Sequence, residues 1–130
     1  MPSPATAANA PQTAYVLPPL PYGYADLAPV IDEPTMRLHH DKHHQAYTDG
    51  INAALSRHPE WQGKSIEEVL RRLADVPAEI RDAVRNQGGG YANHILFWDS
   101  LTPRGAGKPD KDITEGINRS FGSLDAFMQR

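Results

Sequence analysis

The sequence contains no cysteine among its 130 residues. This absence excludes disulfides, thiolate metal ligands and iron–sulfur clusters, so any bound transition metal would have to be held by nitrogen and oxygen ligands. Long hydrophobic runs are also missing. None approaches the roughly 20 apolar residues that a membrane-spanning helix needs, so we expect no membrane partner.

A strong charge of either sign is absent as well. The chain carries 13 basic and 16 acidic residues, for a net charge of -3, which argues against nucleic acid as a partner. Residues 1–14 carry no charged side chain, and they lack the features of a secretory signal or a mitochondrial presequence. We therefore expect residues 1–14 to form a flexible tail and the protein to be cytoplasmic, with the mitochondrial matrix as the alternative if the source is eukaryotic.

Helical periodicity dominates the remaining sequence, and no segment has a convincing strand pattern. Asp32 is a good N-cap and Pro34 suits a first helical turn, so we expect one long helix over 33–57. Its predicted inner face consists of Met36, His39, His43, Tyr47, Ile51 and Ala54. The three prolines within 18–21 predict an extended segment before this helix.

Shorter helices are predicted after the first one. Ser65 and Glu68 match a capping box, and Pro77 opens another short helix. The glycine run 88–90 should break the helical pattern. Such a run lets backbone pass close to a neighbour, or starts the next helix without side-chain obstruction. Further helices are expected over 91–101, 112–121 and 123–130.

Histidine is concentrated in one place, since four of the six histidines lie within residues 39–44. On an α-helix His39, His43 and Tyr47 share one face, and histidine is the usual nitrogen ligand of transition metals near neutral pH. A second helix carries His94 beside Phe97 and Trp98. These two helices together predict a metal site between them.

Other interpretations of these histidines have to be weighed. Spacing alone suggests that His39 and His43 bind one ion, as an i,i+4 histidine pair does in zinc metalloproteases. There, however, a glutamate directly follows the first histidine, and here that position is His40. Surface histidines on a solvated helix need no function. A single residue such as His94 on an apolar helix face is more often a hydrogen-bonded core residue than a ligand.

Several motifs occur in an order that resembles one family. They are Leu17-Pro-Pro-Leu-Pro-Tyr22-Gly-Tyr24, then His39-His-Asp-Lys-His43-His-Gln-Ala-Tyr47, then Asn52-Ala-Ala-Leu55, then Asn86-Gln-Gly-Gly-Gly90-Tyr-Ala-Asn93-His94-Ile-Leu-Phe-Trp98. This order closely resembles the N-terminal part of the iron/manganese superoxide dismutases, over about 15–103 and more faintly to 121–123.

The resemblance implies a mainly α fold, an antiparallel long helical hairpin followed by the truncated start of a C-terminal α/β domain. Residues 15–107 would form the hairpin domain and residues 108–130 the opening helices of the incomplete second domain. The expected activity is conversion of superoxide to oxygen and hydrogen peroxide by a redox-cycling metal. A homodimer or homotetramer is implied for the full-length form.

The resemblance also assigns roles to individual residues. His39 and His94 correspond to metal ligands, which replaces the pairing of His39 with His43 that spacing alone suggested. His43 would line the substrate channel and Tyr47 would gate it. Trp98 would form an aromatic wall of the site, and the basic Lys42 would attract the small anion near the channel mouth.

Residue Gly90 bears on the choice of metal. It stands four positions before His94, where manganese-type members have glycine and iron-type members typically have a glutamine that contacts metal-bound solvent. Phe97 fits the manganese type too. The expected cofactor is therefore manganese, with iron as the alternative.

The sequence departs from the family in one respect. The other two protein ligands of the family, an aspartate and a histidine from an Asp-x-Trp-Glu-His segment, are absent, so we expect this chain alone to be nearly inactive. Three interpretations follow: the N-terminal part of a dismutase, a short relative that binds metal without turnover, or a helical interaction module whose histidines are relics.

Overall fold

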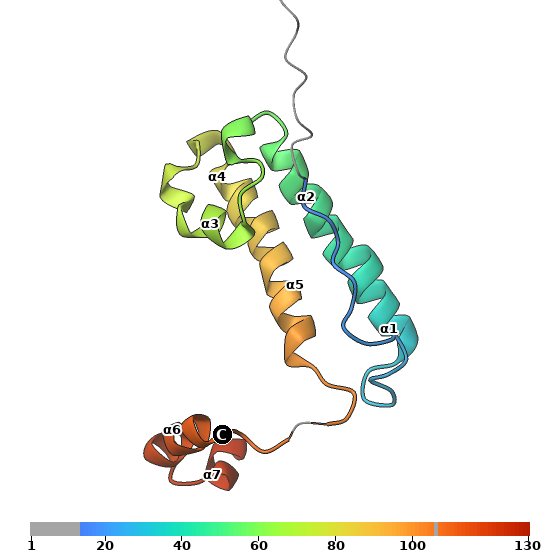
Figure 1. The fold of residues 1–130 in the computed structure, drawn as a ribbon, viewed down its shortest axis with the longest axis vertical. Coiled ribbons are helices and arrows are strands. Elements are labelled where there is room, and N and C mark those ends of the chain that lie inside the picture. Colours follow the sequence, from blue (N-terminus) through green and yellow to red (C-terminus); the bar gives the residue numbers. More distant parts are fainter. Residues whose placement is uncertain (1–13, 106) are drawn as a thin grey trace, which may run out of the picture.

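The computed structural model describes residues 14–105 and 107–130, so that residues 1–13 of the predicted tail lie outside the described residues. Two long helical arms run antiparallel (Figure 1). The first arm is α1 (Glu33–Leu38), the π-helical segment η1 (His39–His44) and α2 (Gln45–Leu55), and the second is α4 (Ala78–Ala83), the π-helical η4 (Val84–Gly88) and α5 (Gly89–Ser100). The predicted helical hairpin is confirmed, and the described part of the chain contains no strand.

Shorter elements complete the chain. Two 3-10 turns, η2 (Pro59–Trp61) and η3 (Leu73–Asp75), flank α3 (Ile66–Arg71) in the connection between the arms. Two helices, α6 (Lys111–Phe121) and α7 (Leu124–Met128), follow the second arm. Among the described residues, no helix is both long and apolar enough to cross a membrane.

Side-chain caps fix where the helices begin. The Oδ1 atom of Asp32 accepts a hydrogen bond from the backbone N–H of Thr35 at 2.8 Å, which satisfies one of the free donors at the start of α1. Ser65 caps α3 in the same way through the N–H of Glu68 at 3.2 Å. Both predicted caps are confirmed.

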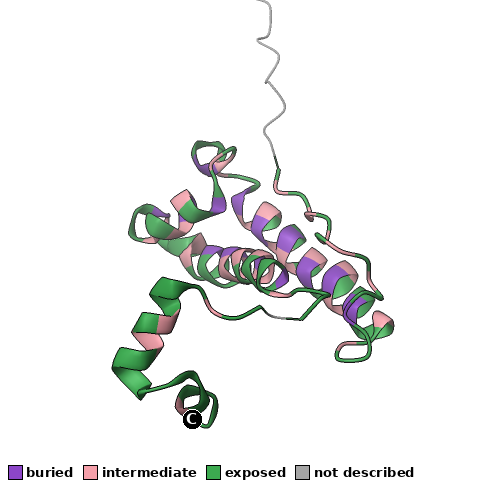
Figure 2. Cartoon of the chain, turned by 60° about the horizontal axis from the view of Figure 1, so that its bottom comes forward, coloured by how far each residue is buried: buried purple, intermediate pink, exposed green. Residues whose placement is uncertain are grey.

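The core lies between the two arms and under the connection that joins them (Figure 2). Its larger cluster comprises Ile51, Leu55, Trp61, Ile66, Val69, Val76, Val84 and Tyr91. A smaller cluster at the open end of the hairpin comprises Leu27, Met36 and Trp98. Burial of these side chains, rather than helix propensity, is what makes the arms pair.

The inner face of the first arm differs from the predicted one. The buried residues are Met36, His40, His44, Thr48, Ile51 and Leu55. His43 is exposed, so its predicted place on the inner face is wrong, whereas His39, Tyr47 and Ala54 are half-buried.

The π-helical segment η1 explains the difference. Met36 and Leu55 are nineteen positions apart, and in an unbroken α-helix of about 100° per residue they would point about 100° apart. A π-helical turn accommodates one extra residue. This brings Met36, His44 and Leu55 onto one buried face and leaves His43 outside it.

The glycine run at 88–90 does not interrupt the second arm, which stays helical through η4 and into α5. The predicted break is therefore wrong, and the alternative of close backbone approach is confirmed. A Cβ atom on Gly88 would lie 3.0 Å from Cδ1 of Ile66, and one on Gly90 would lie 2.2 Å from Cδ1 of Tyr47. The glycines allow the first arm and α3 to pack directly on the helix backbone.

The proline-rich segment runs along the hairpin in an irregular extended path, as predicted (Figure 1). Tyr15 and Asn52 exchange two hydrogen bonds of 2.8 Å. The hydroxyl of Tyr22 donates to the carbonyl of Trp98 at 2.9 Å. The segment is thereby held to both arms.

Helices α6 and α7 pack on each other through Phe121 and Phe127, whose ring centroids are 5.0 Å apart. Gly122 joins them with a positive φ of 83°, a conformation that glycine adopts without strain. Ile113, Leu124 and Met128 are exposed. The boundary between the hairpin and a second domain, predicted at 107/108, stays a prediction.

Candidate metal centre

The two predicted ligands meet between the arms. His39 projects from η1 and His94 from α5, and their Nε2 atoms are 3.0 Å apart. The two rings meet edge to face, with centroids 4.9 Å apart. Residues separated by 55 positions in the sequence thus present the same ring atom to the same point.

The proton of the His94 ring is placed by the backbone of its own helix. Its Nδ1 atom lies 2.7 Å from the carbonyl oxygen of Gly90. A carbonyl only accepts, so Nδ1 must carry the hydrogen and the neutral ring keeps its lone pair on Nε2. A hydrogen bond from the second ring nitrogen to a carbonyl is the arrangement that typically orients a metal-binding histidine.

The pair fits one side of a transition-metal site. Imidazole nitrogens bind such ions at about 2.1 Å, so two nitrogens 3.0 Å apart can reach the same ion. Across residues 14–105 and 107–130, no group of three or more His, Cys, Asp or Glu side chains is placed to hold a metal. Since a stable centre takes roughly four to five ligands, these two histidines supply part of one.

The surroundings of His39 favour its neutral form. Burial lowers the pKa of His39, and the neighbouring His94 and His43 lower it further. A partly desolvated imidazole resists protonation because its charge would be poorly hydrated and would be repelled by positive charge on a neighbouring ring. At neutral pH the His39 ring therefore keeps a lone pair available for a metal.

Aromatic side chains surround the histidine pair. The ring of Trp98 lies 4.8 Å from that of His39, the ring of Phe97 lies 5.3 Å from it, and the ring of Tyr47 lies 5.2 Å from that of His94. A hollow of about 300 Å³ opens on this side, lined by His39, Asn93, His94 and Phe97. Aromatic rings therefore border the histidine pair, and solvent or a small ligand can approach it through this hollow.

The remaining predicted residues lie at the edge of this cluster. His43 is exposed, with its ring centroid 5.8 Å from that of His39. Lys42 is exposed on η1. Gly90 lies beneath the Tyr47 ring, where a side chain would collide with it. The structure therefore brings His39, His94, Tyr47 and Trp98 together, with His43 outside them.

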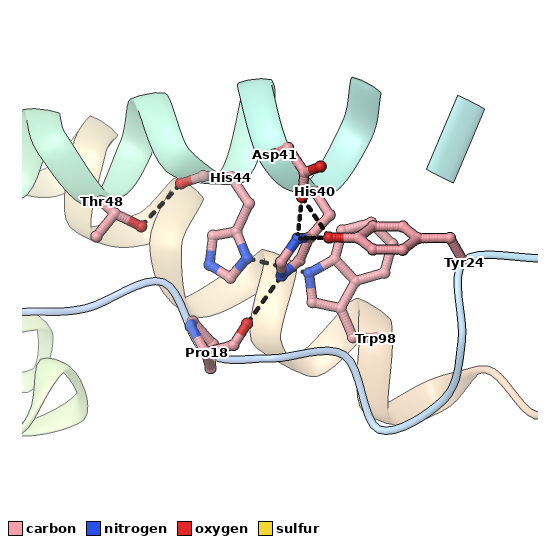
Figure 3. Close-up of polar contacts among 7 residues, drawn as sticks. All are labelled: Pro18, Tyr24, His40, Asp41, His44, Thr48 and Trp98. Atoms are coloured by element: carbon pink, nitrogen blue, oxygen red, sulfur yellow. Dashed lines mark hydrogen bonds and ion pairs between the residues drawn. The ribbon is translucent and has the colours of Figure 1, made fainter. Parts of the chain in front are cut away.

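Two histidines that the sequence analysis passed over lie deeper than the predicted ones (Figure 3). His44 is fully buried and His40 is 5% exposed. The indole N–H of Trp98 donates to Nδ1 of His44 at 3.0 Å. A four-residue spacing through Met36, His40, His44 and Thr48 could have indicated their burial, but a single sequence does not reveal the π-helical turn.

His44 is kept neutral by its surroundings. Burial, followed by the nearby His94 and His40, lowers its pKa to about 4, while the backbone of Tyr91 acts in the opposite direction. Its Nε2 atom has no hydrogen-bond partner among the described residues. A neutral ring here adds no positive charge next to the two predicted ligands.

His40 ties the extended segment to the first arm (Figure 3). Its Nδ1 lies 2.7 Å from Oδ1 of Asp41, and its Nε2 lies 2.8 Å from the carbonyl oxygen of Pro18. The Tyr24 hydroxyl donates to the same Asp41 oxygen at 2.5 Å. The hydrogen bonds from Tyr24 and then His40 lower the pKa of Asp41, so the residues next to His39 are held in a fixed network.

Comparison with known proteins agrees with this arrangement. Residues 14–102 match the alpha-hairpin domain of the iron/manganese superoxide dismutases. The chain is 48% identical over 116 residues to "Superoxide dismutase [Mn]" of Listeria innocua, covering 89% of this chain and 57% of that protein. It is 47% identical over 113 residues to the protein of the same name from Pseudomonas aeruginosa, covering 87% and 55%, and 46% identical over 114 residues to "Superoxide dismutase [Mn] 1" of Leptolyngbya boryana, covering 88% and 46%. The chain spans about half the length of these relatives.

Proposed function

This chain belongs to the iron/manganese superoxide dismutases, and from that premise we propose that it provides the N-terminal, two-histidine part of a manganese-dependent superoxide dismutase. Iron is the alternative metal. Relatives named for manganese support the choice, as does Gly90, which leaves no side chain at the position where iron-type members typically have glutamine.

The observation that carries the proposal is the meeting of two ring nitrogens. Nε2 of His39 and Nε2 of His94 are 3.0 Å apart, and the carbonyl of Gly90 keeps the His94 lone pair on Nε2. His39 and His94 would hold the ion. When bound, manganese supplies a centre that cycles between its +2 and +3 states, which oxidises one superoxide to oxygen and reduces the next to hydrogen peroxide with proton uptake.

The protein's own residues would control access and protons. The rings of Tyr47, Phe97 and Trp98 border the histidine pair and would exclude bulk water from it. The Tyr47 hydroxyl would gate the channel and join the hydrogen-bond network that leads to the metal-bound solvent. The exposed Lys42 would raise the local concentration of a small anion, and His43 would line the route inward.

The proposal extends to the assembly. Since the histidine pair is only part of a ligand set, we propose that activity requires oxygen and nitrogen ligands from a second, α/β domain, and that residues 15–107 are the hairpin domain and residues 108–130 the start of that second domain. The complete enzyme would be a homodimer or homotetramer. Its location would be cytoplasmic, or the mitochondrial matrix in a eukaryote.

Metal titration of the full 130-residue chain tests the proposal. The EPR signal of free Mn²⁺ should fall when the wild-type chain is added, and His39→Ala and His94→Ala should each abolish that uptake. His58→Ala is the control, because His58 pairs with the exposed Glu60 at the other end of the hairpin. Uptake that survives His94→Ala would contradict the proposed site and favour an interaction module whose histidines are relics.

A superoxide assay on the manganese-loaded chain tests the second half of the proposal. We expect little or no turnover because the two histidines do not complete a site. Turnover comparable to that of complete family members would show that no further ligands are required. Metal uptake without turnover even after a complementary domain is supplied would instead support a metal-binding relative without catalytic activity.

A further inference from the structure

We propose that His44 is a positioning residue of the metal centre, whose imidazole holds the His94 ring by stacking and the Trp98 indole by a hydrogen bond. The inference deepens the proposed function and rests on it for the identity of the site. It concerns a histidine that would bind no metal itself and that would act only through its two neighbours.

The contact between His44 and His94 is a stack. The two ring centroids are 5.1 Å apart and the ring planes differ by only 19°, whereas the ring of His39 meets His94 at 81°. His94 is therefore held on one face by His44 and at its Nδ1 by the carbonyl of Gly90. These two contacts fix both the tilt and the rotation of the ring, and so the direction in which Nε2 points.

The contact between His44 and Trp98 is a buried hydrogen bond of 3.0 Å. Indole N–H can only donate, so Nδ1 of His44 must accept and its proton must sit on Nε2. The Trp98 ring in turn lies 4.8 Å from the ring of His39. His44 thus touches one proposed ligand directly and reaches the other through a single side chain.

The position of His44 is itself well determined. The side chain is fully buried, and its backbone carbonyl accepts a hydrogen bond from the Thr48 hydroxyl at 2.9 Å. The ring cannot serve as a ligand in this arrangement, since Nδ1 is occupied by Trp98 and Nε2 carries the proton. Its placement next to both proposed ligands therefore fits support rather than coordination.

Two substitutions separate the two contacts. His44→Asn keeps an oxygen acceptor near the place of Nδ1 but removes the stacked ring. His44→Phe keeps a ring to stack on His94 but leaves the Trp98 N–H without an acceptor. His58→Phe is the control for a histidine-to-phenylalanine change at the other end of the hairpin.

The first measurement uses NMR on the metal-free chain. In His44→Phe the indole N–H of Trp98 should exchange with solvent at least about tenfold faster than in the wild type, with Trp61, the other tryptophan, as the internal reference. In His44→Asn that N–H should stay protected while the His94 ring signals broaden. A Trp98 N–H and a His94 ring unchanged in both variants would overturn the inference.

The second measurement is Mn²⁺ affinity by EPR. Loss of a group that orients a ligand typically weakens metal binding by about 10- to 100-fold, and we expect at least a tenfold loss in each variant but none in His58→Phe. Disordered rings with wild-type affinity would also overturn the positioning role. If His44→Phe does not fold, Trp98→Phe removes the same hydrogen bond from the other side, and unchanged affinity there would refute the contribution of that bond.

The two proposals can fail separately. A wild-type chain that binds no Mn²⁺ would defeat the proposed metal site, and the NMR comparison on the metal-free chain would still decide whether His44 orders His94 and Trp98. A wild-type chain that binds Mn²⁺ through His39 and His94, with no response to either His44 substitution, would leave the metal site standing and reject the role of His44.

Discussion

A single methyl group on Gly90 should destabilise the hairpin relative to the same change one residue earlier. The added Cβ would lie 2.2 Å from Cδ1 of Tyr47, whereas carbon atoms in contact are usually about 3.5–4.0 Å apart, so the ring must move by about 1.5 Å. Such overpacking typically costs about 1–3 kcal/mol. Alanine also gains about 1 kcal/mol over glycine in a helix, which leaves Gly90→Ala neutral to about 2 kcal/mol less stable than the wild type.

Gly89 provides the matched control for this prediction. It lies in the same helix, and a Cβ there would meet nothing within 4 Å, so Gly89→Ala should gain up to about 1 kcal/mol from helix propensity alone. Urea unfolding followed by circular dichroism should therefore separate the two variants by about 1–3 kcal/mol. Equal stabilities, with the Tyr47 ring signals unchanged in Gly90→Ala, would refute the argument that this ring requires a glycine beneath it.

Three further predictions concern stability. Because burial lowers the pKa of His44 from 6.5 to about 4, the unfolded metal-free chain takes up this proton first as the pH falls, so about 3 kcal/mol of unfolding free energy should be lost between about pH 6.5 and pH 4; urea titrations that show equal or greater stability at the lower pH would contradict this. Tyr24→Phe removes the hydroxyl that donates to Asp41 at 2.5 Å and should cost about 1–2 kcal/mol in chemical denaturation, and a change within error would mean that water replaces the bond. Ile51→Ala empties a fully buried position and should cost about 2–5 kcal/mol, against less than about 0.5 kcal/mol for Leu96→Ala at an exposed one, both measured by thermal unfolding.

Much of the architecture was predictable because local signals agree with the tertiary packing. Asp32 and Ser65 cap helices as their sequence context indicates. The apolar periodicity identified both arms, and the proline-rich segment is extended. The order of motifs placed His39 and His94 on different arms, and the structure brings their Nε2 atoms within 3.0 Å.

The predictions that failed depend on contacts between distant segments. A glycine run normally weakens a helix, but packing of Ile66 and Tyr47 against Gly88 and Gly90 keeps the second arm continuous. Periodic spacing assumed an unbroken α-helix and therefore pointed His43 inward. The π-helical turn places His44 on the inner face instead, and no single residue within 39–44 predicts such a turn.

The π-helical segment η1 makes the length of the first arm as important as its residue types. Inserting one further residue within 41–43 would exceed what this π-helical turn absorbs, and every following side chain would be rotated by about 100° relative to those before it. His39 would keep its place while Thr48, Ile51 and Leu55, which are buried on the far side of η1, would turn away from the second arm. Deleting one codon here would remove the π-helical turn and leave the buried face of the first arm in register, but inserting one would uncouple the proposed metal ligand from the hydrophobic core.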